Sequence, residues 1–421
     1  MEDILHYIWK FRLFQKDLQT TTGQVIEVID VGLPNTNAGP DFFNAKVKIG
    51  DKVWAGNIEI HKTSGDWVKH NHHKDKSYNS VILHIVEKAD SEVLNEQGMS
   101  VMQCEIMYPE YIKENYSFLI HSNTDIPCCN YISSIPGFHL SSWMNTLLIE
   151  RLERKAGHIQ TLLDRFMNSW EDAFYVLLSR NFGFGLNSDS FERLALSLPL
   201  KYIQKQGDNL IQIEALLFGQ AGMLDNTDIK DDYFALLQKE YSFLKNKYEL
   251  KSLESYTFKM LRMRPTAFPQ LRIAQLAALL HSSHGLFSKI ISCEDVGRIR
   301  LMFHVNASEY WQTHYTFGER SEKKSKYLGD SSLDIVLINT VAPLLFLYGK
   351  SINSEEYCER AFKFLEEIKP EKNAITKRFE KLSIPLKNAA DSQAMIQLKR
   401  EYCEVRKCLF CRIGHRVLKS N

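Results

Sequence analysis

The chain of 421 residues lacks a strong charge of either sign, because 52 Lys and Arg balance 51 Asp and Glu and leave a formal net charge of +1. Such a chain has no general field that would draw it to nucleic acid or to a membrane surface, so any such contact must be local. It also lacks an apolar run of the roughly 18 residues that span a bilayer. The best segment, "TVAPLLFLYG", is shorter. Both absences speak against a membrane partner.

Cysteine is scarce, with eight in the chain, and the N-terminal "MEDILHYIWKFRLF" lacks the basic start of a secretory signal. A large chain without an export signal is expected to keep its cysteines reduced. We therefore expect a cytoplasmic protein without a disulfide framework. A hydrophobic content of 44% and a charged content of 24% are those of an ordinary globular protein.

The hydrophobic pattern changes character near residue 135. An N-terminal helical pattern precedes five short segments rich in Val and Ile, which predict strands: "QVIEVIDVG", "FFNAKVKIG", "KVWAGNIEIH", "NSVILHIVEK" and "SVMQCEIM". A short helix is expected between the third and the fourth. Beyond "PCCNYISSIPG" the period is helical almost throughout. The prediction is an α+β protein, with an α/β domain over residues 1–130 and a large all-α domain of about ten helices over residues 131–421.

The predicted hairpin contains ionisable residues that could bind a metal ion. Glu59 and His61 are two residues apart on one strand, so they share a face, and Asp41 begins the preceding strand. A turn at Gly50 and Asp51 would fold Asp41 back toward Glu59. Two carboxylates that meet in this way form a hard-oxygen site suited to Mg²⁺ or Mn²⁺. The alternative is that Glu59 and His61 line the solvent face of an ordinary hairpin.

The segment that starts with "PD" at Pro40 and Asp41, and continues through a hairpin, "EIH", a helix and "VILHIV", resembles the PD-(D/E)XK nuclease core. The resemblance covers roughly residues 1–110. It implies a nuclease-like mixed sheet in which Asp41 and Glu59 bind metal. In that family a lysine stands two residues after the second acid, and here His61 takes its place. A histidine can act as a base or as a phosphate donor, but its charge depends on pH.

The chain as a whole resembles a family of uncharacterised bacterial proteins of about this length. The stretches that carry the likeness are "NAGPDFFNAK", "GNIEIHKTSGDWVKH", "SRNFGFGLNS", "RIAQLAALLH" and "CLFCRIGH". They span nearly the whole sequence. This resemblance implies no established activity.

Further ionisable residues follow the hairpin. Five of the 14 histidines fall between His61 and His84. On a helix His72 and Asp75 would share a face at i,i+3, and His84 on its strand could lie beside Glu59. One interpretation is that His72, Asp75 and His84 add ligands or a proton relay to the carboxylates. The other is a solvated helix followed by one buried, hydrogen-bonded histidine.

The C-terminal "YCEVRKCLFCRIGH" holds Cys403, Cys408 and Cys411 in a C-x4-C-x2-C spacing, with His415 close behind. Ligands at such intervals can hold zinc, or an iron–sulfur cluster with a fourth cysteine such as Cys128 or Cys129. The alternative is a final helix on which Cys408 and Cys411 pack as small apolar residues.

Local charge indicates where nucleic acid could bind. From Ser255 to Cys293 there is no acid, and the stretch contains the basic residues Lys259, Arg262, Arg264 and Arg272. Such residues could contact phosphates. Two functions follow from the sequence. One is a divalent-metal-dependent nuclease with Asp41 and Glu59 as ligands and His61 as base or donor. The other is a non-catalytic, nuclease-derived module that binds nucleic acid or a protein partner. The sequence does not predict the oligomeric state.

Overall fold

The computed structural model describes residues 2–226 and 228–420, and the chain divides into two compact units. The first comprises residues 1–140 together with residues 398–421, and the second comprises residues 141–397. This division differs from the predicted boundary at residues 130 and 131. The C-terminal segment returns to the first unit, whereas the sequence had placed it in the helical domain.

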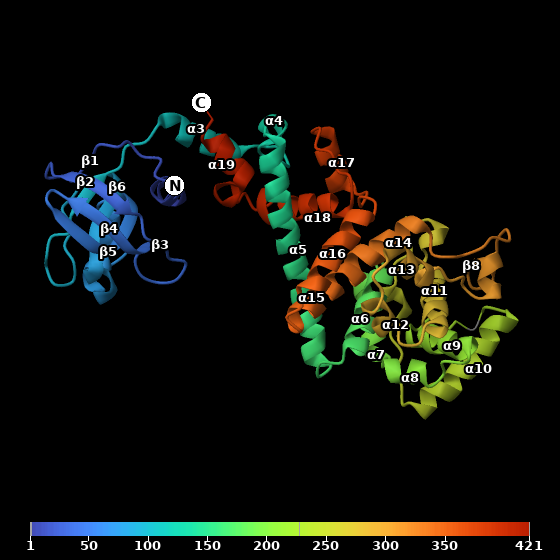
Figure 1. Cartoon of the computed structure of the whole chain (residues 1–421). Helices are drawn as coiled ribbons and strands as arrows, with labels where there is room; N and C mark the ends of the chain where they lie inside the picture. The colour runs from blue at the N-terminus through green and yellow to red at the C-terminus, as the bar shows by residue number, and fades with distance from the viewer. Residues whose placement is uncertain (1, 227, 421) are drawn as a thin grey trace. The chain divides into compact units, whose positions relative to one another are not determined.

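The first unit contains the sheet and a few helices (Figure 1). Its elements as far as the sheet extends are α1 (Glu2–Lys10), β1 (Leu18–Gln19), β2 (Val25–Asp30), β3 (Leu33–Pro34), β4 (Phe42–Ile49), β5 (Lys52–Thr63), α2 (Asp66–Lys69), η1 (His72–Lys74), η2 (Lys76–Ser80), β6 (Val81–Lys88) and β7 (Gln103–Glu105). The rest are α3 (Glu110–His121), α4 (Cys129–Ile132), η7 (Lys399–Cys403), η8 (Cys408–Phe410) and α19 (Arg412–Leu418). Helix α19 packs against α3.

The sheet is mixed, with the strand order β1-β2-β4-β5-β6-β7 and with β3 paired to β4. Strand β4 pairs antiparallel with β2 and β5, whereas β5, β6 and β7 run parallel. The turn between β4 and β5 falls at Gly50 and Asp51, as predicted, and Gly50 has a φ of +58°, which glycine adopts without strain. The parallel pair β5 and β6 is joined through α2, because parallel neighbours need a crossover connection.

Both faces of the central strands are covered. On one face, α1 contributes Ile4, Leu5, Ile8 and Trp9 to a core that includes buried residues of β4, β5 and β6. The Trp9 indole donates a hydrogen bond to the backbone oxygen of Val31 at 3.0 Å. A smaller cluster contains Trp67 of α2 together with the buried residues Tyr78, Val81, Val93 and Val101. The second half of β5, from Ile58 to His61, is therefore fully buried, charged side chains included.

Over residues 141–226 and 228–397, the second unit consists of helices and one short hairpin. Its helices are α5 (Gly137–Arg165, which begins in the first unit), α6 (Trp170–Phe182), α7 (Ser188–Ser197), α8 (Leu200–Gln204), α9 (Leu210–Gln220), α10 (Asp232–Lys247), α11 (Pro269–Ser282), α12 (Leu286–Ile291), α13 (Val296–Phe303), α14 (Asp330–Val336), α15 (Ala342–Ser351), α16 (Glu355–Glu367), α17 (Ala374–Lys381) and α18 (Ala389–Leu398). Short turns are η3 (Ser255–Thr257), η4 (Pro265–Ala267), η5 (Glu309–Thr313) and the π-helical η6 (Leu337–Val341), and the hairpin is β8 (His314–Thr316) with β9 (Glu319–Arg320). The predicted α+β class, with a mixed sheet first and helices after it, is confirmed.

One continuous helical stretch, Asp330–Ser351, is long and apolar enough to cross a membrane. Of its most apolar window, 67% is buried inside the protein. A helix that is apolar on all sides is expected in the core of a large helical unit, so this stretch has the character of a core helix. The cytoplasmic location stays a prediction.

Candidate metal centre

The two carboxylates of the predicted site meet across the β4–β5 hairpin. The backbone N–H of Asp41 donates to Oε2 of Glu59 at 3.2 Å, and the N–H of Ile60 donates to Oδ2 of Asp41 at 2.9 Å. This register follows from the turn at residues 50 and 51 and from the pairing of Phe42 with Ile58. Glu59 is buried and Asp41 is partly exposed. The convergence that the hairpin predicted is therefore present.

Two histidines of the site lie on neighbouring parallel strands. His61 shares its strand face with Glu59, and His84 of β6 is in register with Glu59. The two rings contact each other, with 2.9 Å between Nδ1 of His61 and Nε2 of His84. Nε2 of His61 lies 3.4 Å from Oε1 of Glu59. The hydrogen-bonded contact with His84 fixes the orientation of the His61 ring, as an outer partner does for a metal ligand.

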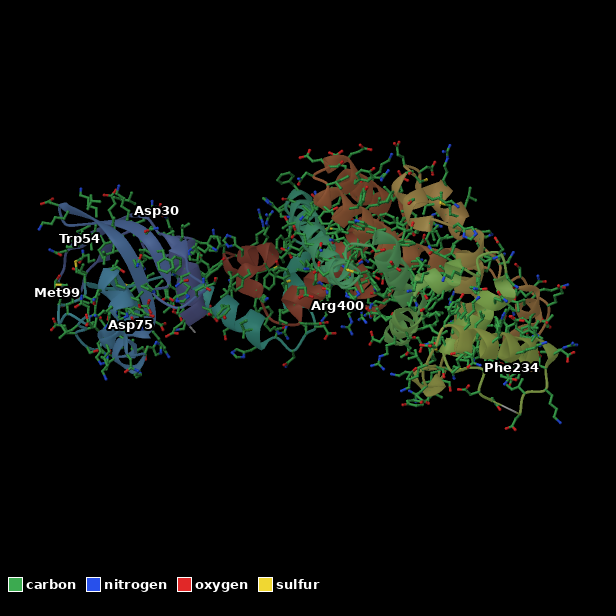
Figure 2. All side chains as sticks on the ribbon, turned by 90° about the horizontal axis from the view of Figure 1, so that it is seen from below. Asp30, Trp54, Asp75, Met99, Phe234 and Arg400 are labelled. Atoms are coloured by element: carbon green, nitrogen blue, oxygen red, sulfur yellow. The ribbon has the colours of Figure 1, made fainter. Side chains whose placement is uncertain are left out.

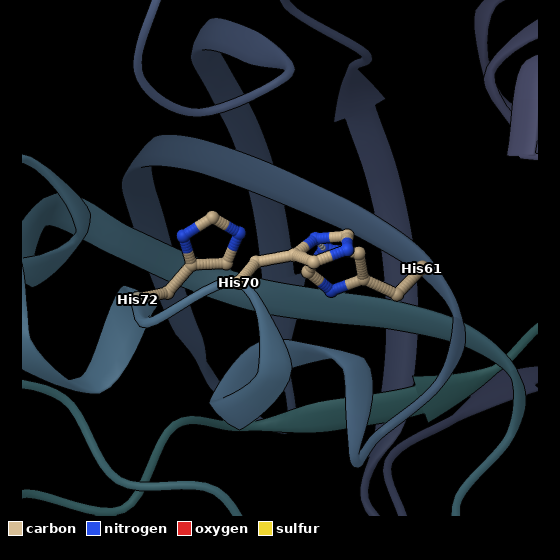
Figure 3. Close-up of side chains that lie close together, drawn as sticks. All are labelled: His61, His70 and His72. Atoms are coloured by element: carbon tan, nitrogen blue, oxygen red, sulfur yellow. Dashed lines mark hydrogen bonds between the residues drawn. The ribbon is translucent and has the colours of Figure 1, made fainter.

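Two more histidines come from the segment after α2. Asn71 has a φ of +63° in the left-handed region, which lets the chain turn between His70 and His72. Nδ1 of His70 lies 3.1 Å from Nε2 of His61, and Nε2 of His72 lies 3.1 Å from Oε1 of Glu59. One ring nitrogen from each of His61, His70 and His72 falls within 4.8 Å of the other two. Figure 3 shows the three rings facing one another from β5 and from the segment after α2.

The His72 ring packs between aromatic neighbours. It stacks on Tyr78 with 3.7 Å between ring centroids, and the fully buried Trp67 meets it edge-on. Nε2 of His72 is buried and lacks an aligned hydrogen bond, although Glu59 is close. A buried polar atom without such a partner calls for an explanation. A cation shared by Glu59 and the imidazoles would provide one.

The protonation states of the site also favour the binding of a cation. Burial raises the pKa of Glu59, the contact with His72 offsets part of this effect, and the nearby charge of Asp41 raises the pKa again. Burial, followed by the neighbouring His84, His72 and His70, lowers the pKa of His61 to about 3. Burial likewise lowers the pKa of His84 to about 3. At neutral pH His61 and His84 are therefore uncharged, and the neutral imidazole is the form that binds metals.

The donor set differs from the hard-oxygen site that the sequence suggested. Three imidazole nitrogens and one carboxylate oxygen suit zinc, iron, copper or nickel, whereas magnesium prefers oxygen ligands. Mn²⁺, which is bound by carboxylates and water and also by histidine, is compatible with the mixed set. His70 is exposed, which leaves one side of the group open to solvent. An open side is typical of catalytic rather than structural metal sites.

His6 of α1 belongs to the site, although the sequence reading missed it. Its Nε2 lies 3.2 Å from Oδ2 of Asp41. Burial alone would lower the pKa of His6, but the contact with Asp41 outweighs burial and raises this pKa above its ordinary value. The only sequence signal was helical spacing: Ile4, Leu5 and Ile8 pack the helix onto the sheet, and His6 thereby lies beside Asp41.

Asp75 does not join the group, and its predicted role as a ligand is corrected here. His72 begins a short 3-10 turn instead of the predicted α-helix, and Asp75 follows this turn with an extended backbone. Asp75 is exposed and accepts hydrogen bonds from the N–H and the hydroxyl of Ser77, both within 3 Å. Figure 2 labels it in the sheet-containing unit.

The C-terminal cysteines lie in the first unit and are buried. Burial raises the pKa of the Cys128 thiol, and the charges of Cys403, Cys411 and Cys408 would raise this pKa further. His415 is placed differently. Nδ1 of His415 is bonded to the hydroxyl of Tyr7, its ring packs on Phe11, and burial lowers its pKa to about 4. The structure thus places His415 against aromatic residues.

The predicted phosphate-binding residues divide into two kinds. Lys259, Arg262 and Arg264 are exposed. Arg272 is buried in α11, donates to Gln275 and Ser332, and lies over the ring of Phe184 at 4.2 Å. The prediction for Arg272 is wrong, because its guanidinium is used inside the helical unit.

The chain is thus an α+β protein with a cluster of histidines and carboxylates on the buried part of a mixed sheet. Residues 2–374 match the family described as protein of unknown function (DUF2851), and the chain belongs to that family. The match ends before the three C-terminal cysteines. No curated protein and no solved structure matches the chain.

Proposed function

We propose that the protein is a divalent-metal-dependent phosphodiesterase that acts on DNA or RNA. The observation that carries the proposal is the meeting of Asp41 and Glu59 across one hairpin, with three histidine nitrogens grouped within 4.8 Å at the same place. Phosphodiester hydrolysis needs such a site, because the metal must be held firmly while one side stays open to water and substrate.

The topology supports the resemblance to the PD-(D/E)XK core. The order α1-β2-β4-β5-α2-β6, with two antiparallel pairings and then a parallel one, is the arrangement that this resemblance implies. Asp41 precedes the second of these strands directly and Glu59 lies on the third. Lys62 is exposed, one residue beyond the position at which that family carries its lysine, so His61 is the residue that faces the carboxylates.

Each residue of the site has a role in this proposal. Glu59, His61, His70 and His72 would hold the ion, and Asp41 would add a carboxylate at the rim. The bound metal supplies Lewis acidity and a hydroxide at neutral pH. His6 takes over part of the role of the missing lysine, because its raised pKa favours the protonated ring and its side chain is partly exposed beside Asp41. A protonated imidazole at this place can donate to a phosphate oxygen.

The test is cleavage of single- and double-stranded DNA and RNA with Mn²⁺, Zn²⁺ or Mg²⁺ present. Asp41→Asn should lower the cleavage rate by about 10²-fold or more, because it removes the carboxylate that would help to hold the metal and the protonated His6. Glu27→Gln is the matched control, since Glu27 is an exposed acid on β2 of the same sheet and should leave the rate unchanged. Absence of cleavage with all three metals, in protein that binds metal, would overturn the proposal.

The alternative is a non-catalytic module that binds nucleic acid, and one surface favours it. In the second unit Lys259, Arg262 and Arg264 are exposed between α10 and α11, and Tyr256 and Leu261 are 80% and 83% exposed beside them. Sites that bind single-stranded nucleic acid typically combine two features. Cations contact the phosphates, and a neighbouring aromatic ring stacks on the bases.

We expect weak, salt-sensitive binding of single-stranded DNA or RNA to this surface. Arg262→Glu together with Arg264→Glu should weaken binding to all sequences alike and flatten the dependence of log affinity on log salt, since phosphate contacts carry no base information. Fluorescence anisotropy at several salt concentrations measures both effects. Lys369→Glu with Lys372→Glu is the control, because it changes the net charge equally on two exposed residues elsewhere in the unit. If both double variants weaken binding equally, the assigned surface is wrong.

A further inference from the structure

The second unit contains a cavity of about 580 Å³ in the region of the exposed cations between α10 and α11. Pockets that bind small ligands usually measure roughly 300–1,000 Å³. Three parts of the chain line the cavity: the segment before α11, the first turn of α11, and the hairpin of β8 and β9, of which β8 packs against α11 (Figure 1). From these parts the lining includes Tyr256, Phe258, Met260, Phe268, Gln270 and Phe317.

The segment before α11 alternates between the cavity and solvent. Phe258 and Met260 line the cavity, whereas Lys259 between them is exposed. The chain returns to the cavity at Phe268, so the two exposed arginines of this surface lie on the loop between the two lining stretches. An anionic chain held by these three cations would therefore run along the rim of the cavity.

This wall of the cavity is fixed by side chains at the start of α7. Asn187, which is 2% exposed, accepts a hydrogen bond from the N–H of Lys259 at 2.7 Å and donates one to the backbone oxygen of Lys259 at 2.9 Å. The hydroxyl of Ser190 donates to the backbone oxygen of Thr257 at 2.6 Å. A wall that is already ordered spares a ligand the entropic cost of fixing a loop. The cavity is therefore preformed.

The lining combines aromatic rings with hydrogen-bond acceptors. Tyr256 lines the cavity although its side chain is 80% exposed, so its ring is available for stacking. Phe258 and Phe317 add two buried rings. The exposed carboxylates of Asp225 and Glu319 also line the cavity. Such a lining suits a planar aromatic ligand that carries N–H donors.

The side-chain amide of Gln270 is short of hydrogen-bond partners. Its Oε1 is buried and lacks a partner among the described residues. Its Nε2 donates to the thioether of Met260 at 3.6 Å, and sulfur is a weak acceptor. A buried carbonyl oxygen without a partner calls for an explanation. The last torsion of a glutamine is soft, so this amide can turn toward a ligand in the cavity that supplies the missing N–H.

We infer that the cavity binds one adenine base of a single-stranded nucleic acid, whose phosphates lie on the neighbouring cations. The inference rests on the nucleic-acid-binding surface proposed above. A glutamine amide recognises adenine by two hydrogen bonds, because its oxygen accepts from the N6 amino group and its N–H donates to N7. Uracil and thymine present a carbonyl oxygen in place of the amino group. The acceptors of Gln270, Asp225 and Glu319 would repel that oxygen.

The test is the affinity of the full chain for a uridine oligonucleotide with one central adenosine, compared with the same strand made of uridine alone. Fluorescence anisotropy should show about 10-fold tighter binding of the adenosine strand, as one good bidentate contact provides. Gln270→Met should remove this preference and leave the affinity for the uridine strand unchanged. Gln204→Met is the matched control, because Gln204 is exposed on α8 and does not line the cavity. The melting temperature shows whether each variant is folded.

Titration with adenosine alone separates the cavity from the phosphate surface. The wild type should bind adenosine about 10-fold more tightly than uridine, and Gln270→Met should bind both equally. Adenosine binding without binding of either strand would overturn the phosphate surface and retain the cavity as a nucleoside site. Equal affinity for the two strands and for the two nucleosides would overturn the cavity and retain the surface. A preference for cytidine or guanosine over adenosine would overturn the choice of adenine.

Discussion

Zn²⁺ or Mn²⁺ should raise the melting temperature of the sheet-containing unit, and His72→Phe should remove most of that rise. At a metal concentration 100 times the dissociation constant, binding to the folded state alone adds about 2.7 kcal/mol. For a unit of this size the gain corresponds to a rise of about 5–11 °C. The phenyl ring keeps the stacking on Tyr78 and lacks the nitrogen near Glu59, so the variant isolates the ligand.

Calorimetric titration provides the affinities. His72→Phe should weaken metal binding by at least about 10²-fold, since even partners that only orient a ligand contribute 10- to 100-fold. His73→Phe is the matched control, because His73 is the next residue but lies outside the group of three histidines. The melting temperature without metal shows whether each variant is folded. The same dissociation constant for wild type and His72→Phe would show that His72 is not a ligand.

The local sequence pattern was enough to predict that the carboxylates of Asp41 and Glu59 meet. The turn residues Gly50 and Asp51 and the alternation along the two strands define a register, and this register brings Asp41 to Glu59. The same reasoning placed His61 on the face of Glu59 and His84 beside it. Strand geometry has a strict period of two, so the placement of His61 follows directly from the sequence, whereas that of His84 also requires the parallel pairing of β5 with β6.

The other members of the site could not be obtained in this way. His70 and His72 converge because Asn71 adopts a left-handed conformation, whereas the sequence suggested a helix there. His6 depends on how α1 packs on the sheet. The absence of acids near Arg272 in the sequence favoured a surface cation, but its side chain is buried in the helical unit, where it donates to Gln275 and Ser332. Each of these outcomes depends on tertiary structure.

The division of the chain into two units could likewise not be predicted from local sequence patterns. Residues 398–421 have helical patterns like those of the segments before them, so the sequence assigned them to the helical domain. The contacts that return them to the first unit join partners almost 300 residues apart, among them those of Arg406 with Ser122 and Thr124. Long-range contacts of this kind leave no periodic signal. The cysteine spacing was the one local hint that this tail has a separate role.

A large effect of pH on stability is expected in the helical unit from Glu214 of α9. This residue is completely buried, its Oε1 lacks a hydrogen-bond partner, and its Oε2 accepts a hydrogen bond from Tyr233 at 2.8 Å. Burial raises the pKa of Glu214 from 4.5 to about 7 in the folded protein. Since the folded state binds the proton more tightly, ionisation of Glu214 costs stability. This cost is absent below pH 4.5, grows from pH 4.5 to pH 7, and is complete above pH 7.

Glu214→Gln removes this ionisation and keeps an oxygen for Tyr233. A difference of 2.5 pKa units corresponds to about 3 kcal/mol, at 1.36 kcal/mol per unit. The amide adds its own constant cost, since its N–H groups need partners. The stability of the variant relative to wild type should therefore rise by about 3 kcal/mol between pH 4 and pH 8, whatever its value at pH 4. Urea unfolding at a series of pH values measures this change, with the exposed Glu254→Gln as the control that should show none. A parallel pH dependence of wild type and Glu214→Gln would mean that Glu214 does not titrate in this range.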